Sequence, residues 1–439
     1  MELRDYQRED VEFFKAHHVA CDFSEQRTGK TYKVCAYIQE ENIGRALIVC
    51  PKSVVYVWQE ALLTFSDITA GIVTEADYAV KPEDRVLIVN YELLRGKKNV
   101  DNFNKWKPEL LVVDEAHRCK NWKSLTYKAI DKLSRYVPRR LYLTGTPVTN
   151  KQYDIWVLLH FLDRNMWGSP YVFLDKFFMC EQIRVAGGRT VNTYEFWKPG
   201  AKQLVQSYLS LHCVQRKRKE VMPWLEETTV TKIKLPATKQ QIVACRDLEQ
   251  YYEHKHIVTQ NVLENLIRTR QILNDPYILG LKGKSPKAVW LSDYVKDYPE
   301  KTILVCSHSK QFLSHLSELN GWPVFSGDTD AERRKDLIDG VQSGNIKVLL
   351  AQTVAISEGI TLSNVDVTIM LDNYCPFSVY LQAKDRMVAT SIEENKPKEL
   401  IEVMIKDSFD ETLFGLVARR CNEAAVINSY KEYLERKCS

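Results

Sequence analysis

The sequence lacks any apolar run long enough to cross a membrane. Its apolar stretches, such as 303–306 and the mostly apolar 365–371, are only as long as a strand, whereas a membrane-spanning helix needs roughly 20 residues. No signal peptide or membrane anchor is visible in the sequence either. We therefore expect no association with a membrane.

The cysteines and histidines do not form the patterns of a disulfide framework or of a zinc site. None of the eleven cysteines belongs to a CxxC pair, and several, such as Cys50 and Cys306, lie within apolar strand patterns. The nine histidines show no zinc spacing. These observations predict buried, reduced thiols in a cytosol-like compartment and no structural metal.

The composition shows neither a bias toward disorder nor a strong net charge. With 45% hydrophobic residues, 27% charged residues and no low-complexity tract, the chain is typical of a globular protein. Its 439 residues are too many for one ordinary core, so we expect two large lobes. The net charge of +4 neither indicates nor excludes a polyanionic partner.

Two adjacent carboxylates follow a short apolar run in the first half of the chain. Residues 110–113 are the branched apolar residues of a strand that is buried on both faces of a parallel sheet, and Asp114 and Glu115 come next. Ligands of an open α/β sheet bind at the carboxyl ends of its strands. The first carboxylate can hold magnesium while the second orients or deprotonates a water. The alternative is an ordinary acidic turn.

A second pattern of a phosphate site lies near the N-terminus, where a strand at 19–23 leads through a polar loop into a helix. The loop contains Gly29, Lys30 and Thr31. In such a loop, backbone N–H groups face a phosphate, the lysine adds positive charge and the threonine hydroxyl can bind magnesium. The full pattern GxxxxGK[ST] fails at its first glycine, which is Ser24 here. A plain polar loop before a helix is the alternative.

Helical stretches separate most of the expected strands, which predicts mainly parallel sheets covered by helices on both faces. A turn of small residues with Thr144, Gly145 and Thr146 follows one strand and is expected to sense whether the Glu115 region is occupied; the alternative is a plain turn. The expected strands are 19–23, 45–51, 85–91, 110–113 and 139–143 in the first half and 301–307, 323–325, 347–352, 365–372 and 399–405 in the second.

The chain between the two sets of strands has a different pattern. Long amphipathic stretches rich in aromatic residues, such as Trp156 and Phe161, run from 151 to about 280. They indicate helices with a packed core, although some rings are candidates for base stacking. The basic run 216–219 is expected to be solvated surface, a phosphate contact or part of a hinge.

Placed in order, these patterns resemble the motifs of the Swi/Snf-type ATPases of helicase superfamily two. The resemblance covers nearly the whole chain, and seven motifs in the right order are more specific than any one of them. The matching stretches are 3–7 (the Q motif, in which Gln7 would recognise the adenine of ATP), 29–31 (motif one), 114–117 extended to 121 (motif two), 144–150 (motif three), 213–221, 268–277, 307–311 (motif four), 352–362 (motif five) and 382–386 (motif six).

The resemblance implies an α/β fold of two RecA-like domains, each a mainly parallel sheet with helices on both faces, plus helical insertions. The ATP-binding domain is expected at 1–224, with a helical insertion at about 151–212. The second domain is expected at 225–439 and begins with a helical segment at about 238–280. Such enzymes track along DNA, usually the duplex, by ATP-driven closure between the two lobes.

The resemblance also assigns roles to single residues, with ATP and magnesium as cofactors. It implies that Glu115, Asp114 and Arg386 are catalytic and that Thr31 and Asp114 hold magnesium. The residues that it implies for ATP binding are Arg4, Gln7, Thr28, Gly29, Lys30, Thr31 and Gly359; those for coupling are Thr144, Gly145, Thr146 and Gln382; those for contacts with the DNA backbone are Lys52, Ser53, Asn150, Ser307 and Thr353.

Two motifs depart from the family pattern, at three positions. Arg27 and Thr28 stand in place of the usual glycine and leucine of motif one, and Ala389 stands in place of the second arginine of motif six. An arginine that contacts the transferring phosphate raises the rate about a thousandfold or more, so its loss predicts slower hydrolysis or a substitute such as Lys384. An ATP-gated nucleic-acid-binding regulator with little hydrolysis therefore stays open as an alternative.

The last predictions concern the biological setting. The chain has no accessory modules of chromatin remodellers and resembles compact phage branch-migration helicases. We therefore expect action on forked or branched DNA, with replication or recombination proteins as candidate partners, in the cytoplasm of a bacterial cell or of a phage-infected host. Residues 114–117 spell DEAH, a motif that also occurs in RNA helicases, so an RNA helicase stays open as an alternative. The motor half of a restriction complex stays open as well.

Overall fold

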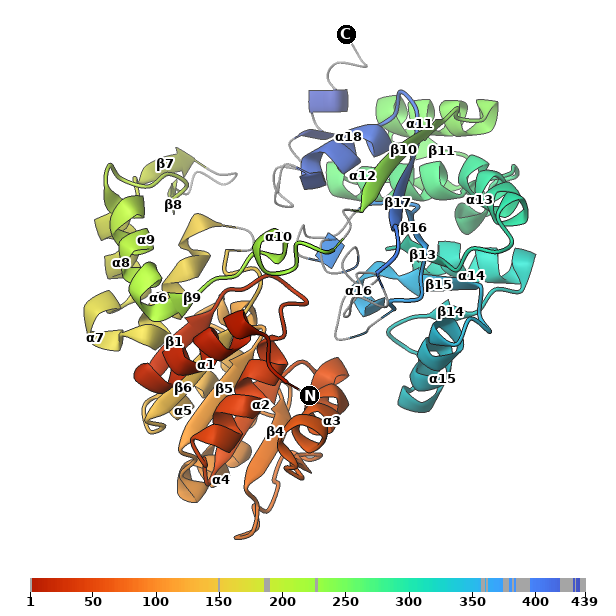
Figure 1. Cartoon of the computed structure of the whole chain (residues 1–439). Helices are drawn as coiled ribbons and strands as arrows, with labels where there is room; N and C mark the ends of the chain where they lie inside the picture. Colours follow the sequence, from red (N-terminus) through yellow and green to blue (C-terminus); the bar gives the residue numbers. More distant parts are fainter. Residues whose placement is uncertain are drawn as a thin grey trace. The chain divides into compact units, whose positions relative to one another are not determined.

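The computed structural model describes residues 2–148, 151–184, 190–225, 228–356, 360, 362–373, 379–380, 383, 395–418, 429–430 and 432–434. The chain divides into two compact units, Met1–Pro223 and Trp224–Ser439, each of which contains one large sheet (Figure 1). The domains expected from the sequence, 1–224 and 225–439, differ from this division by one residue.

Unit 1 alternates strands with helices through its first part and continues with a mostly helical segment. Its strands are β1 (Val19–Asp22), β2 (Ala46–Cys50), β3 (Gly71–Ile72), β4 (Val86–Asn90), β5 (Leu110–Asp114), β6 (Arg139–Leu143), β7 (Glu181–Arg184), β8 (Thr190–Thr193) and β9 (Cys213–Val214). Its α-helices are α1 (Asp5–Ala16), α2 (Lys30–Glu40), α3 (Val55–Ser66), α4 (Lys97–Trp106), α5 (Leu125–Ser134), α6 (Trp156–Leu162), α7 (Arg164–Trp167), α8 (Pro170–Phe177), α9 (Ala201–His212) and α10 (Arg218–Val221). Its 3-10 helices are η1 (Lys52–Val54), η2 (Ala116–Cys119) and η3 (Gln152–Ile155).

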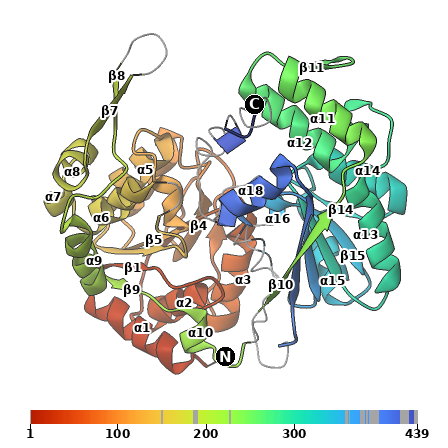
Figure 2. The ribbon, with the colours of Figure 1, turned by 90° about the horizontal axis from the view of Figure 1, so that it is seen from above.

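The described strands of unit 1 form a seven-stranded sheet in the order β3-β4-β2-β5-β6-β1-β9. Figure 2 labels β4, β5, β1 and β9 of this sheet. Every pairing in this sheet is parallel. Parallel strands are covered on both faces, and residues 110–113 accordingly have no exposed surface. Because the strands run in one direction, the loops after the neighbouring strands β5, β6 and β1 leave the same edge of the sheet, where α/β proteins bind ligands.

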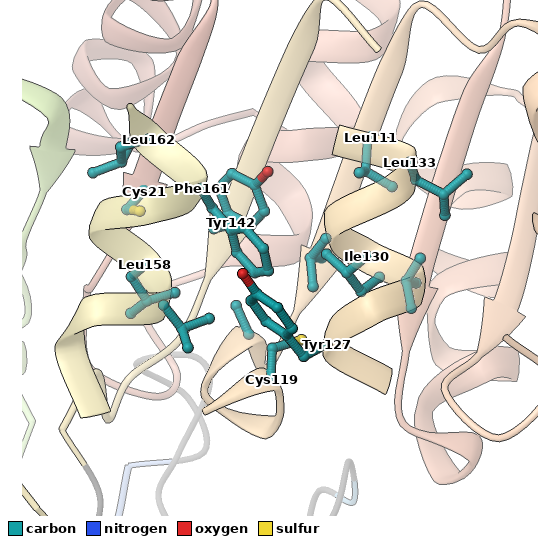
Figure 3. Close-up of a cluster of buried hydrophobic side chains, with 14 of the residues drawn as sticks. Cys21, Leu111, Cys119, Tyr127, Ile130, Leu133, Tyr142, Leu158, Phe161 and Leu162 are labelled. Atoms are coloured by element: carbon teal, nitrogen blue, oxygen red, sulfur yellow. The ribbon is translucent and has the colours of Figure 1, made fainter. Parts of the chain in front are cut away.

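Alternate side chains of these strands belong to two cores, one on each face of the sheet. Val112 of β5 packs in the core of α1, α2 and α3, whereas Val113 packs in the core of α4, α5 and α6. In the second core the ring of Phe161 is stacked on Tyr142 and Tyr127, with centroids 5.0 and 5.6 Å away (Figure 3). Phe161 is therefore a core residue, as its helical spacing predicts, and offers no surface for stacking on a base.

The segment between α6 and β9 is not wholly helical. The sequence pattern predicts a helical insertion at about 151–212, but the backbones of β7 and β8 within this range pair as an antiparallel hairpin. The helical prediction is wrong for this hairpin, because four residues per strand are too few to stand out from the helical periodicity around them. The segment contains helices on both sides of the hairpin, namely α6, α7, α8 and α9.

Unit 2 begins with one strand and a helical segment, and strands and helices then alternate. Its strands are β10 (Thr229–Leu235), β11 (Glu253–His254), β12 (Ile257–Val258), β13 (Ile303–Ser307), β14 (Val324–Phe325), β15 (Val348–Gln352), β16 (Val367–Met370) and β17 (Glu399–Ile405). Its helices are α11 (Lys239–Tyr251), α12 (Val262–Asn274), the 3-10 helix η4 (Pro276–Leu279), α13 (Pro286–Asp297), α14 (Lys310–Asn320), α15 (Ala331–Gln342), α16 (Thr353–Ile356) and α18 (Phe409–Ala418).

The described strands of unit 2 form a six-stranded sheet in the order β10-β17-β16-β13-β15-β14, in which every pairing is parallel. Helices α13 and α14 pack on one face, and α15, α16 and α18 pack on the other. Both units are therefore parallel sheets between layers of helices, which confirms the predicted fold class. Among the described residues, no helix is both long enough and apolar enough to span a membrane.

Candidate functional site

The loop between β1 and α2 has the backbone shape of a phosphate-binding loop. Gly29, the N-cap of α2, has a φ of 80°, a left-handed conformation that glycine adopts at no steric cost. Lys30 begins the helix, and its Nζ donates to the backbone oxygens of Ser24 and Glu25 at 2.8 and 3.0 Å. The lysine therefore folds over the loop, beside a helix N-terminus that favours an anion.

Residues of α1 close another side of this loop. Tyr6 Oη and Gln7 Nε2 donate to the backbone oxygen of Thr28 at 3.1 and 3.2 Å. Gln7 Oε1 accepts the backbone N–H of Arg4 at 3.0 Å, and a Cβ added to Gly29 would lie 2.1 Å from Gln7 Nε2. Four of the residues expected to bind ATP, Arg4, Gln7, Thr28 and Gly29, thus lie next to one another.

The two carboxylates after β5 have different surroundings. Asp114 Oδ2 accepts the indole N–H of Trp58, and Oδ1 accepts the backbone N–H of Glu115, both at 2.9 Å. Burial raises the pKa of Asp114 to about 6, and the charge of Glu115 adds to this effect. Glu115 has a left-handed backbone with a φ of 52°, which costs a non-glycine residue of order 1 kcal/mol. Such strain concentrates at active sites.

A histidine of the same motif links Glu115 to the turn after β6. His117 Nδ1 lies 3.2 Å from Glu115 Oε2 and 3.0 Å from Thr144 Oγ1. Thr144 Oγ1 also accepts the backbone N–H of Thr146 at 3.1 Å. A Cβ added to Gly145 would come within 3.5 Å of backbone atoms of the phosphate-binding loop. The turn of motif three therefore touches motifs one and two.

A buried cluster of charges lies beneath the phosphate-binding loop. Lys33 Nζ lies 2.8 Å from Asp10 Oδ2 and 2.6 Å from Asp22 Oδ2, and none of the three side chains has exposed surface. Arg216 pairs with Asp10 at 2.7 Å, and its backbone N–H donates to Ser24 Oγ at 3.1 Å. Burial raises the pKa of Asp22, but nearby positive charges, Lys33 foremost, hold it below its usual range. The cluster therefore joins the loop to the basic run 216–219.

The arrangement fits a magnesium ion and the phosphates of a nucleotide. Asp114 and Thr31 carry oxygen atoms of the kind that magnesium prefers and would be its ligands. Lys30 and the N-terminus of α2 would supply positive charge for the phosphates. Burial lowers the pKa of Lys30, whereas the carboxylates of Asp22, Glu115 and Asp114 counteract this effect. The remaining predicted residues of this site and of the DNA contact, Asn150, Gly359, Gln382 and Arg386, lie outside the described residues.

The residues expected to contact DNA differ in exposure. Lys52 is exposed and Ser53 is half-buried, both in η1 at the start of α3. Ser307 has no exposed surface: its hydroxyl donates to Asp372 and accepts the backbone N–H of Ser309 at 3.0 Å. Thr353 is 1% exposed. In this conformation Ser307 and Thr353 offer no side-chain surface to DNA, and their DNA contact stays a prediction.

Three side chains at the site were not among the residues that the sequence singled out. His117 belongs to the DEAH motif itself, so the signal was present. Trp58 holds the carboxylate of Asp114, and Tyr91 Oη donates to the backbone oxygen of Asp114 at 2.5 Å. Both aromatic residues are almost fully buried, and nothing in the sequence separates them from ordinary core residues.

Two family models match the chain. Residues 17–278 match the model described as the SNF2-related domain, and residues 286–389 match the model described as the helicase conserved C-terminal domain. The chain belongs to the SNF2-related family. This membership confirms the predicted resemblance to the Swi/Snf-type ATPases. The first match includes the phosphate-binding loop, both acidic residues after β5 and the turn of motif three.

Individual relatives of this SNF2-family chain are distant. It is 25% identical to the SWI/SNF-related matrix-associated actin-dependent regulator of chromatin subfamily A member 1 of Mus musculus, over 94% of this chain and 42% of that protein. It is 34% identical to the DNA repair and recombination protein RAD54 of Saccharomyces cerevisiae, over 31% of this chain and 17% of that protein. The solved SWI2/SNF2 ATPase core of Sulfolobus solfataricus in complex with dsDNA aligns with a TM-score of 0.46 at 21% identity, over 98% of this chain and 92% of that one. The chain spans about two fifths of the length of the first of these curated relatives.

Proposed function

We propose that this SNF2-family chain is the motor of an ATP-dependent DNA translocase. The observation that carries the proposal is the meeting of three motifs at one sheet edge: Lys30 after β1, Asp114 and Glu115 after β5, and Thr144 after β6. A binding protein that only recognises a nucleotide has no need of a strained acidic residue beside the phosphate-binding loop.

Each residue of the site has a separate task in this proposal. Lys30 and the N-terminus of α2 bind the phosphates, and Asp114 and Thr31 hold magnesium. When bound, magnesium supplies positive charge that neutralises the phosphate oxygens during transfer. Glu115 orients the attacking water and accepts its proton, for which a carboxylate held in a fixed position by a strained backbone is suited.

The contact between His117 and Thr144 couples the nucleotide site to the rest of unit 1. His117 Nδ1 is hydrogen-bonded to Thr144 Oγ1 and lies 3.2 Å from Glu115 Oε2. A change at Glu115 during hydrolysis therefore alters the hydrogen bonds of the motif-three turn directly. We propose that this is the first step by which hydrolysis changes the affinity for DNA.

The proposed substrate is duplex DNA, and forked or branched DNA in particular. Lys52 and Ser53 contact its backbone, which gives binding without sequence preference. Support comes from the compact motif arrangement, which resembles phage branch-migration helicases, and from the relative named for DNA repair and recombination. Replication or recombination proteins as partners, and the cytoplasm of a bacterial cell or of a phage-infected host as the location, stay predictions.

The test is ATP turnover by the purified chain without nucleic acid and with single-stranded DNA, duplex DNA, forked DNA or RNA. Lys30→Ala is the blank, because it removes the phosphate-binding ammonium. We expect little turnover by the chain alone, strong stimulation by duplex DNA and the strongest by forked DNA. Turnover that no nucleic acid changes would contradict the proposal.

Two further outcomes of this assay would identify a different function. Stimulation by RNA but not by duplex DNA would indicate an RNA helicase. Tight ATP binding that strengthens the DNA complex without turnover would indicate a nucleotide-gated regulator, the interpretation to which Ala389 in motif six points.

A further inference from the structure

The carboxylate of Asp114 is held by a side chain 56 residues away in the sequence. Trp58 of α3 donates its indole N–H to Asp114 Oδ2 at 2.9 Å. The indole nitrogen is a donor only, so this bond can form in one direction alone. Trp58 is 1% exposed, so water cannot replace the bond. One oxygen of the expected magnesium ligand is therefore held by helix α3.

Packing fixes the ring of Trp58 to its helix. Val55, Trp58 and Leu62 are 5%, 1% and 0% exposed and form one buried stripe of α3, with the spacing of a helix face. Tyr56, between the first two, is 65% exposed and lies on the other side of the helix. The indole therefore moves with α3 rather than independently of it.

The same helix begins at the residues that are proposed to contact DNA. Lys52 and Ser53 form η1 with Val54, and α3 starts at the next residue. At 1.5 Å of rise per residue, the six residues from Lys52 to Trp58 span roughly 9 Å. A shift of the helix start on DNA binding thus moves the indole N–H relative to Asp114 Oδ2.

We propose that Trp58 is a positioning residue that couples the DNA contact at the start of α3 to the carboxylate of Asp114. The inference rests on the proposed function, since it assumes that Asp114 holds magnesium and that η1 contacts DNA. Trp58 contacts neither the nucleotide nor the DNA. It sets the position of one carboxylate oxygen of Asp114. Loss of the Trp58 N–H group therefore weakens magnesium-dependent nucleotide binding and makes this binding independent of DNA.

The chain offers a matched control in Trp156. This residue is also in unit 1 and is 2% exposed, and its indole N–H donates to the backbone oxygen of Trp167 at 3.1 Å. Trp58→Phe and Trp156→Phe each remove one buried indole N–H bond and leave an aromatic ring. Only the first of these bonds ends on a residue of the nucleotide site.

The first experiment measures the binding of a fluorescent ADP analogue by anisotropy, in a chelator and in a magnesium titration. For Trp58→Phe we expect unchanged affinity in the chelator, because Lys30 and the loop are intact. We expect the magnesium concentration at half-saturation to rise about tenfold, the effect of a lost hydrogen bond to a charged group. Trp156→Phe is expected to match the wild type in its affinity in the chelator and in its magnesium concentration at half-saturation. An unchanged magnesium titration of Trp58→Phe would overturn the proposal.

The second experiment repeats the titration with saturating duplex DNA. DNA is expected to change the magnesium dependence of nucleotide binding in the wild type and in Trp156→Phe, and by linkage the nucleotide changes DNA affinity by the same factor. In Trp58→Phe this factor is expected to fall to near one. If Trp58→Phe keeps the wild-type factor, Trp58 is not the coupling residue. If the wild type itself does not bind DNA, the proposed function and the coupling fail together, while the first experiment still decides whether Trp58 positions Asp114.

Benzothienylalanine at position 58 covers the case in which Trp58→Phe does not fold. This residue has the bicyclic shape of tryptophan and a sulfur in place of the N–H group, so it fills the same space without donating. We expect it to reproduce the rise in the magnesium requirement. Wild-type behaviour of this variant would show that the volume of the ring, not its N–H group, is what Asp114 needs.

Discussion

Replacement of Lys33 by methionine removes the central charge of the cluster beneath the phosphate-binding loop. Methionine fills most of the space of the lysine side chain, so the main change is electrostatic. Asp10 keeps its ion pair with Arg216 at 2.7 Å. Asp22 keeps the backbone N–H of Ser24, at 2.9 Å, and the more distant positive charge of Lys30. The variant therefore leaves Asp22 as a buried carboxylate without its closest positive charge.

The expected cost is large because the pair is fully buried. Breaking such a pair by removing one partner costs roughly 3–5 kcal/mol. At roughly 2–4 °C per kcal/mol for a unit of this size, the Tm of unit 1 is expected to fall by roughly 6–20 °C. Differential scanning calorimetry at neutral pH measures this change.

The same variant has a predicted dependence on pH. In the wild type, the lowered pKa of Asp22 contributes stability that is present above its usual value of 3.8 and is lost as pH falls through the lowered value. Without Lys33, the burial of Asp22 is opposed only by Lys30 and by the N–H group of Ser24, so the pKa of Asp22 rises relative to the wild type and this stability is reduced. The deficit of Lys33→Met is therefore expected to be larger at neutral pH than near pH 4.

Two further variants separate this explanation from a packing defect. Lys33→Met combined with Asp22→Asn removes both charges and is expected to recover at least half of the lost Tm. Lys98→Met breaks the pair with Asp77, whose side chains are 72% and 57% exposed, and is expected to leave the Tm unchanged. A deficit of Lys33→Met that is the same at both pH values, and that Asp22→Asn does not relieve, would refute the electrostatic reasoning.

Three other substitutions test the nucleotide site. Glu115→Gln is expected to bind ATP normally and to lower turnover roughly 10²- to 10⁴-fold, measured by phosphate release against nucleotide affinity; normal turnover would exclude Glu115 as the base. Thr144→Val keeps the shape of the side chain and removes the bond to His117, so nucleotide affinity is expected to persist while DNA stimulation of turnover falls; equal stimulation would remove Thr144 from the coupling path. Gly29→Ala places a Cβ 2.1 Å from Gln7 Nε2, at a backbone position that is left-handed. Because this displaces the side chain expected to recognise adenine, ATP binding is expected to weaken more than GTP binding in a competition assay. An equal loss for both nucleotides would mean that Gln7 does not recognise the adenine base.

The central strands could be predicted from the sequence because burial on both faces leaves a continuous apolar run. Ala46–Cys50 and Leu110–Asp114 have such runs, and their ends lie within one residue of the predicted 45–51 and 110–113. Strand β10 has no such run: Lys232 and Lys234 alternate with apolar residues, and both lysines are exposed. It pairs with β17, far along the chain. This pairing depends on tertiary structure, so the periodicity of residues within one segment cannot predict it.

The candidate site could be predicted in part, for a similar reason. Motif residues such as Lys30 and Asp114 are recognisable because their chemistry requires a residue type at a fixed spacing. Trp58 and Lys33 act through contacts with residues far from them in sequence, and a buried tryptophan or a lysine in a helix has no distinctive pattern. Ser307 shows the converse: the motif suggests a DNA contact, but the structure uses the hydroxyl to bind Asp372.

The geometry around His117 explains how one histidine can report on the state of Glu115. Its Nδ1 lies 3.2 Å from Glu115 Oε2 and 3.0 Å from Thr144 Oγ1. The hydrogen bond of Nδ1 is to Thr144, and the Glu115 carboxylate is a close polar neighbour of the same atom. We propose that Glu115 loses its negative charge when it takes a proton from water, which weakens its attraction for His117. His117, and with it the hydrogen bond to the turn of motif three, would then change in the same step as the chemistry.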